Sequence, residues 1–123
     1  SEVAKAAFAE GFYPDVITDD LTCLSNDPQT SRLTVHMGEC MALGMSFEDV
    51  LERVTTVPAS FMNGVTRGIV RGNCADITIL ELQEGPHMFT DAFGEKYEGN
   101  VNIIPRTTIV AGKVKYNTIE TDY

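Results

Sequence analysis

The apolar positions in the first half of the chain recur about every three to four residues, the spacing of a helix. This pattern predicts helices over 3–10, 32–43 and 46–57. The first two are followed by Gly11 and Gly44, and glycine is the residue that most often ends a helix. The third opens with a serine that has an aspartate three residues later, close to a capping box, and it stops before a proline. The front half of the chain is therefore predicted to be mainly helical.

One short segment between the first two helices has the composition of a strand. Residues 16–18 read Val-Ile-Thr, and they follow Pro14, which blocks further helix. Residues 19–31 are polar and rich in turn-forming side chains, which predicts a surface loop. The order helix, strand, loop indicates an α/β unit, in which chemistry gathers at the C-terminal end of the strand.

Beyond Asn63 the hydrophobic period changes from that of a helix to that of a strand. Residues 75–82 alternate between apolar and polar, and Gly94 and residues 111–113 are typical of turns. Further strands are predicted over 87–90, 96–104, 107–110 and 114–116. The chain therefore divides near residue 64 into a helical part and a β-rich part.

Composition and charge narrow the class of protein. The chain has 123 residues, enough for one small domain but well short of the roughly 250 of a complete TIM barrel. Eighteen acidic side chains against nine basic ones give a net charge of −9, which argues against nucleic acid or an anionic membrane as a partner. No apolar run reaches the length of a membrane span. Three cysteines without a C-x-x-C spacing indicate reduced thiols, as expected of a cytoplasmic protein.

Four blocks of the chain carry more specific patterns. Residues 11–21 read Gly-Phe-Tyr-Pro-Asp-Val-Ile-Thr-Asp-Asp-Leu, 43–59 end in Thr-Thr-Val-Pro-Ala, 68–80 contain Gly-Asn-Cys-Ala-Asp, and 91–116 close with an Ala-Gly-Lys turn. In order and spacing these blocks resemble the metal-dependent amidohydrolases, the superfamily of dihydroorotases, adenine deaminases and related deacetylases. The resemblance implies an α/β fold that forms the C-terminal portion of such an enzyme. Residues 1–64 would be the last β/α unit and trailing helices of a TIM-like barrel, and 65–123 would be part of a small β-sandwich.

The same resemblance implies one catalytic and metal-binding residue, Asp20. Its carboxylate would bind a divalent metal, expected to be zinc, accept a proton from the metal-bound water and pass it to the leaving nitrogen. Asp19 is the alternative if the register differs by one, because adjacent side chains on a strand point to opposite faces. Taken from composition alone, both acids would be solvated loop residues or a helix cap.

The other metal ligands usual in the superfamily are absent from the sequence. The chain contains two histidines, His36 and His87, and neither lies in the His-x-His pair that such enzymes carry. His36 is expected to be a core or surface histidine, His87 to be exposed, and Cys23 to be a packed thiol. Because a catalytic zinc wants at least three protein ligands, the chain alone is expected to be metal-free and inactive.

Two functions from different classes remain open on the sequence. In the first, the complete enzyme hydrolyses a C–N bond in a small molecule: a cyclic amide, an N-acyl compound or an aminated base. Unpaired strand edges then favour homo-oligomers of the isolated chain. In the second, the chain is a stand-alone, non-catalytic interaction or scaffold domain, expected to be a monomer. A flavodoxin-like binding domain fits less well, because no glycine-rich phosphate loop follows a predicted strand.

Overall fold

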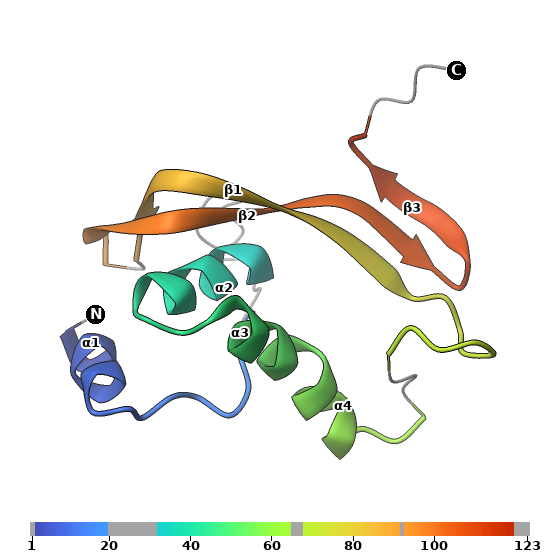
Figure 1. The fold of residues 1–123 in the computed structure, drawn as a ribbon, viewed down its shortest axis with the longest axis horizontal. Coiled ribbons are helices and arrows are strands. Elements are labelled where there is room, and N and C mark those ends of the chain that lie inside the picture. The colour runs from blue at the N-terminus through green and yellow to red at the C-terminus, as the bar shows by residue number, and fades with distance from the viewer. Residues whose placement is uncertain (1, 20–31, 65–67, 92, 120–123) are drawn as a thin grey trace.

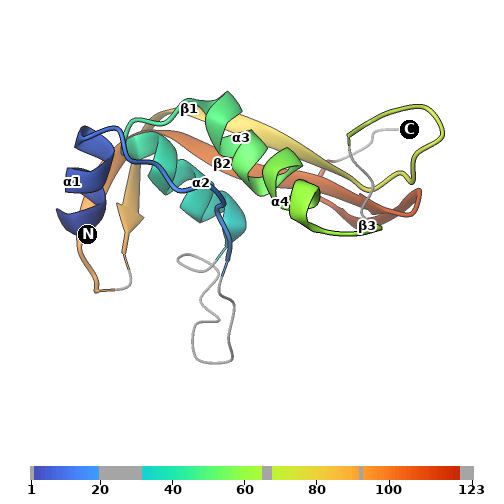
Figure 2. The same cartoon turned by 90° about the horizontal axis from the view of Figure 1, so that it is seen from below.

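The computed structural model describes residues 2–19, 32–64, 68–91 and 93–119. Four helices precede three strands in these residues: α1 Glu2–Ala9, α2 Leu33–Ala42, α3 Phe47–Val54, α4 Thr56–Phe61, β1 Ile77–Thr90, β2 Lys96–Val110 and β3 Lys113–Asn117. Strands β1 and β2 form a long twisted ribbon, and the helices lie along one side of it (Figures 1 and 2). No helix in the described part of the chain is long and apolar enough to cross a membrane.

The sheet is antiparallel with the order β1-β2-β3. Sequence analysis predicted four strands where the structure has only β1 and β2, each continuous but bent. The predicted breaks coincide with irregularities in the pairing, one between Glu84 and His87 and one where Leu80 faces Pro105. Proline cannot donate a ladder hydrogen bond and is tolerated at such bulges, so the strands bend there instead of ending.

The turn between β2 and β3 is held by an aspartate that directly precedes β1, the strand at the other edge of the sheet. Ala111 has a positive φ of 49°, unusual for a residue with a side chain. The Asp76 carboxylate accepts a hydrogen bond of 2.8 Å from the Ala111 amide, and the Gly112 amide donates to the Ala75 carbonyl at 3.0 Å. Asp76, the residue before β1, thus makes a structural bond to the turn between β2 and β3.

Replacing Asp76 with alanine is expected to lower the free energy of unfolding by about 1 kcal/mol, because the charged acceptor of the Ala111 amide is lost. Urea denaturation of wild type and variant measures the difference. The matched control adds Ala111→Gly to the variant, since glycine tolerates the positive φ and recovers part of the loss. Equal midpoints for wild type and Asp76→Ala would contradict this role.

The predicted helix ends are confirmed, with one correction. Gly11 and Gly44 have φ of 77° and 114° and follow α1 and α2. The Ser46 hydroxyl accepts a hydrogen bond from the Asp49 amide at 3.1 Å and donates to the Asp49 carboxylate at 2.9 Å, which caps α3. The third helix does end before Pro58 as predicted, but α3 already ends at Val54, and Pro58 belongs to a separate short helix, α4, that was not predicted. Pro58 lies in the first turn of α4, where the missing amide hydrogen is not needed.

Residues 16–18 do not form the predicted strand. They lie in an irregular segment between α1 and the part of the chain outside the described residues. A strand requires a neighbouring strand for its hydrogen bonds, and the three strands of this structure pair among themselves. The Ile17 amide instead donates to the Arg53 carbonyl at 3.1 Å. The segment therefore has the β-branched composition of a strand but adopts an irregular conformation.

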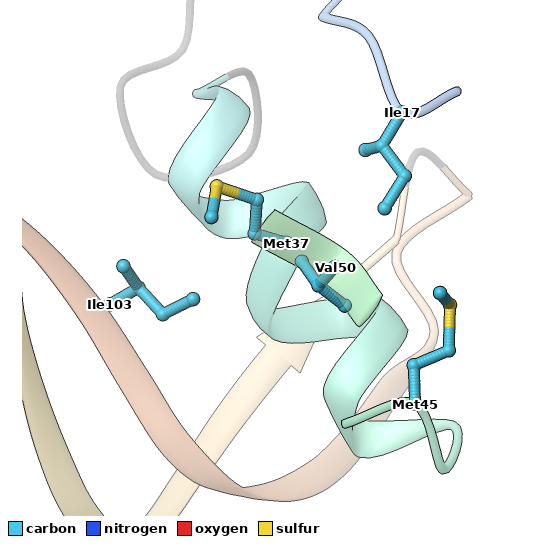
Figure 3. Packing of buried hydrophobic residues seen from close by; sticks show 5 residues of the cluster. All are labelled: Ile17, Met37, Met45, Val50 and Ile103. Atoms are coloured by element: carbon cyan, nitrogen blue, oxygen red, sulfur yellow. The ribbon is translucent and has the colours of Figure 1, made fainter. Parts of the chain in front are cut away.

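The core lies where α2, α3, β2 and this irregular segment meet. Its buried members are apolar, and Figure 3 shows them as sticks: Ile17, Met37, Met45, Val50 and Ile103. Ile17 retains only 8% of its accessible surface. The segment that precedes the acidic pair is therefore anchored to the helices by its own side chain.

A second close contact joins α2 to the sheet. Phe89 is 2% exposed and lies between Gly38 of α2 and Gly99 of β2. A Cβ atom added at Gly38 would be 2.7 Å from Phe89 Cζ, and one added at Gly99 would be 2.6 Å from Phe89 Cε2. Both distances are too short for carbon atoms. The absence of side chains at these two positions therefore lets α2 approach the ribbon.

Candidate functional site

The predicted catalytic residue Asp20 lies outside the described residues, as does Cys23. The structure does describe the path that leads to Asp20. Along this path, Arg53 of α3 donates a hydrogen bond of 2.7 Å from its Nε to the Pro14 carbonyl. Together with burial of the Ile17 side chain, this contact fixes residues 14–17 against α3.

Asp19, the alternative candidate, faces α2. Its Oδ1 atom lies 3.7 Å from Nε2 of His36, and Nδ1 of His36 is 3.0 Å from Oε2 of Glu39. His36 is half-buried between the two carboxylates, and its pKa is raised above the usual 6.5. The hydrogen bond to Glu39 is the largest cause, burial opposes it, and the charges of Glu39 and Asp19 add to the rise.

Sequence analysis did not find this acidic cluster around His36. His36 and Glu39 are three residues apart on a helix, a spacing that places both side chains on one face and could have indicated the pair. The contact with Asp19 joins residues from two different elements, so no local pattern reports it. The expectation of a core or surface histidine fits the half-buried position of His36.

The raised pKa of His36 predicts a pH dependence of stability. Because the folded-state pKa exceeds the unfolded value of about 6.5, the stabilisation by protonated His36 is complete below that value. It is lost as the pH rises through the folded-state pKa. An NMR titration should find the pKa of the His36 ring above 6.5, and Glu39→Gln should lower it. A ring that titrates identically in both proteins would contradict the coupling, and His36→Gln identifies its resonance.

Glu39 also connects α2 to the sheet. Burial and a hydrogen bond to the Glu39 carboxylate raise the pKa of Tyr97 above its usual range, so this phenol stays protonated at neutral pH. Cys40 follows Glu39 in the chain, and burial raises the pKa of its thiol to about 11. The Cys40 thiol is therefore protonated at neutral pH and is a poor nucleophile.

An open cleft of about 380 Å³ lies beside these polar groups. Phe8, Phe12 and Leu43 are among its apolar wall residues, and His36, Glu39 and Tyr97 supply polar atoms. The cleft thus lies between α1 and α2, next to the segment that leads to the acidic pair.

The described residues do not complete a metal site. No group of three or more histidine, cysteine, aspartate or glutamate side chains in these residues could hold a metal ion. Asp19 and Glu39 each contact the His36 ring, one at each of its two nitrogens. His87 is half-buried, not exposed as predicted, because its ring packs edge-on against Phe89 with centroids 4.7 Å apart.

Comparisons with known proteins relate the chain to hydrolases. A family model for a deacetylase-like composite domain matches residues 69–116. A deacetylase of Brucella anthropi is 30% identical over 113 residues, which are 91% of this chain and 28% of the relative. A deacetylase of Agrobacterium fabrum is 33% identical over 95 residues, 76% of this chain and 23% of the relative.

Solved structures agree with these relatives. The crystal structures of an adenine deaminase and of a dihydroorotase each match with a TM-score of 0.82, at 26% and 30% sequence identity. Each match covers 94% of this chain and 32% of the solved chain. The chain is thus similar in fold and sequence to amidohydrolases, as the resemblance predicted. Within that class, this chain is related to the deacetylases, and it spans less than a third of the length of the two curated relatives described above.

Proposed function

We propose that this chain is the C-terminal part of a metal-dependent hydrolase that acts on C–N bonds of small molecules. The observation that carries the proposal is the match of 94% of the chain to two amidohydrolase structures, of which it covers only 32%. The substrate would be a cyclic amide, an N-acyl compound or an aminated base. The names of the deacetylase relatives favour the N-acyl compound among the three.

The chain would contribute to two domains of the complete enzyme. Residues 1–64 would be the end of a TIM-like barrel, and 65–123 would be part of a composite β-sandwich. Three observations support this division: α4 ends at Phe61, β1 begins at Ile77, and the composite-domain model matches 69–116. In the complete barrel, residues 16–18 would find the neighbouring strand that they lack here.

Asp20 would bind the metal and move the proton. Asp19 supports this assignment, because its carboxylate is directed toward His36 on α2. If residues 16–20 join the barrel sheet, adjacent side chains point to opposite faces, and Asp20 then faces away from α2. An ionised carboxylate in that position could accept a proton from the nucleophilic water and deliver it to the leaving nitrogen.

The complete enzyme would hold a divalent metal, expected to be zinc, with Asp20 as one ligand and the others from residues beyond this chain. When bound, such a metal would polarise the C=O or C=N group of the substrate, and it would lower the pKa of a bound water so that the water is nucleophilic at neutral pH. A lone aspartate does not meet the requirement of a catalytic zinc for three protein ligands. This chain by itself is therefore expected to bind no catalytic metal and to be inactive.

Metal analysis and hydrolysis assays on this chain and on the complete protein test the proposal. The assays use one cyclic amide, one N-acyl compound and one aminated base. We expect metal and activity in the complete protein only. A chain of 123 residues that is itself metal-loaded and active would refute the proposal. A complete protein without metal or activity would favour the scaffold alternative, and its native mass would then decide whether it is a monomer.

A further inference from the structure

We infer that the cleft between α1 and α2 is a binding site for a small ligand that joins an apolar body to a primary ammonium group. The apolar walls take the body, and the Glu39 carboxylate accepts hydrogen bonds from the ammonium. The inference goes beyond the proposed function, because it requires neither a metal nor Asp20. None of residues 16–18 lines the cleft, so their conformation does not enter the argument.

The cleft has the size and lining of a small-molecule site. Its volume of about 380 Å³ falls in the range of about 300–1,000 Å³ that is usual for such sites. Helix α1 contributes Ala4, Ala7 and Phe8, and α2 contributes Leu43. The Phe8 ring packs against the buried core and meets Tyr13 edge-on, with centroids 5.1 Å apart. The cleft therefore offers a preformed apolar surface to the body of a ligand.

The polar groups of the cleft gather around one carboxylate, that of Glu39. Its Oε2 atom lies 3.0 Å from Nδ1 of His36, and the Tyr97 hydroxyl donates to the same carboxylate. A carboxylate has about four lone-pair sites, so about two remain after these two contacts. The Glu39 side chain is 17% exposed, which keeps it within reach of a ligand while most of it is shielded from water. An ammonium group supplies the donors that these sites lack.

The charges around the cleft favour a cation over an anion. No lysine or arginine is among the described residues that line it. Glu39 and Asp19 carry two negative charges on either side of His36, which carries at most one positive charge. The net charge of the chain, −9, has the same sign. A negative field beside apolar walls attracts a cation and repels a carboxylate ligand.

The experiment titrates this chain of 123 residues with three probes of similar size and different charge: 4-phenylbutylammonium, 4-phenylbutanol and 5-phenylpentanoate. Shifts of the backbone amide resonances in NMR spectra measure Kd and locate the probe. With the ammonium we expect saturable shifts at the residues that line the cleft. The alcohol should bind at least about 10-fold more weakly, because a neutral donor makes the weaker hydrogen bond to a carboxylate. The carboxylate probe should not bind.

Two pairs of variants locate the site. Glu39→Gln should weaken binding of the ammonium by about 10-fold, because it removes the charge that the ammonium contacts. Glu52→Gln changes the net charge equally at an exposed position of α3 and should leave Kd unchanged. Ala7→Leu fills the cleft and should abolish binding, whereas Ala6→Leu on the exposed side of α1 should not. Leucine is a good helix former, and the thermal midpoint of each variant verifies its fold.

Three results would overturn the inference. The first is the absence of saturable shifts with the ammonium probe. The second is equal affinity for the three probes, since the cleft would then not distinguish charge. The third is unchanged binding in Ala7→Leu, since the probe would then lie elsewhere. None of these measurements involves metal or hydrolysis, so the proposed function can fail or succeed independently.

Discussion

Replacing Asp20 with asparagine in the complete protein is expected to lower kcat for C–N hydrolysis by about 10²- to 10⁴-fold. Asparagine keeps the size of the side chain and an oxygen that can contact a metal. It cannot accept a proton, so the step that activates water and protonates the leaving nitrogen is lost. Initial rates at saturating substrate measure kcat, and metal analysis of the variant separates loss of chemistry from loss of metal.

Asp19→Asn is the matched control for this prediction. Asp19 contacts His36 on α2, so its loss should reduce stability slightly and leave kcat close to that of wild type. A large loss of kcat in Asp19→Asn with little effect in Asp20→Asn would mean that the register is shifted by one residue. Wild-type kcat in both variants would exclude the acidic pair from the reaction.

Replacing Gly99 with alanine is expected to destabilise the fold by about 1–3 kcal/mol, the cost of overpacking a filled site. The added Cβ would lie 2.6 Å from Phe89 Cε2 and 2.9 Å from Ala42 Cβ. The Ala42 atom is bonded directly to the helix backbone, so it can move only if α2 moves. Urea denaturation measures the loss.

A second substitution checks the cause of this loss. Phe89→Leu shortens the side chain that the new Cβ meets, so the double variant should lose less than the sum of the two single variants. Glu98→Ala, at an exposed neighbour on β2, should change stability little. Strict additivity of Gly99→Ala and Phe89→Leu would contradict the contact.

Local signals were sufficient for much of the helical part. The Ser46–Asp49 cap and the glycines after α1 and α2 depend on residues a few positions apart, and all were predicted. The bent strands were predicted in pieces, with gaps at 83–86 and 105–106, whereas the long ladder continues past Pro86 and Pro105. The hydrogen bonds along the rest of the β1–β2 ribbon outweigh the loss of the backbone N–H donors at the two prolines.

The contacts around the candidate site were not predictable from neighbouring residues. Arg53 and Pro14 are 39 residues apart, and Asp19 and His36 come from two different segments of the chain. The assignment of Asp20 came from a family resemblance and not from a local pattern. Residues 16–18 have strand composition without a partner strand, so their local preference is not expressed.

Helix α2 has a consequence for protein engineering, since it carries Gly38 against Phe89 and, less than one turn away, His36 against Asp19. The β-rich part therefore cannot be exchanged freely. A chimera that combines residues 1–64 with the sheet of a deacetylase relative should tolerate at most a phenylalanine-sized side chain opposite Gly38. A bulkier ring there would displace the helix, and the displacement would reach Asp19 through His36.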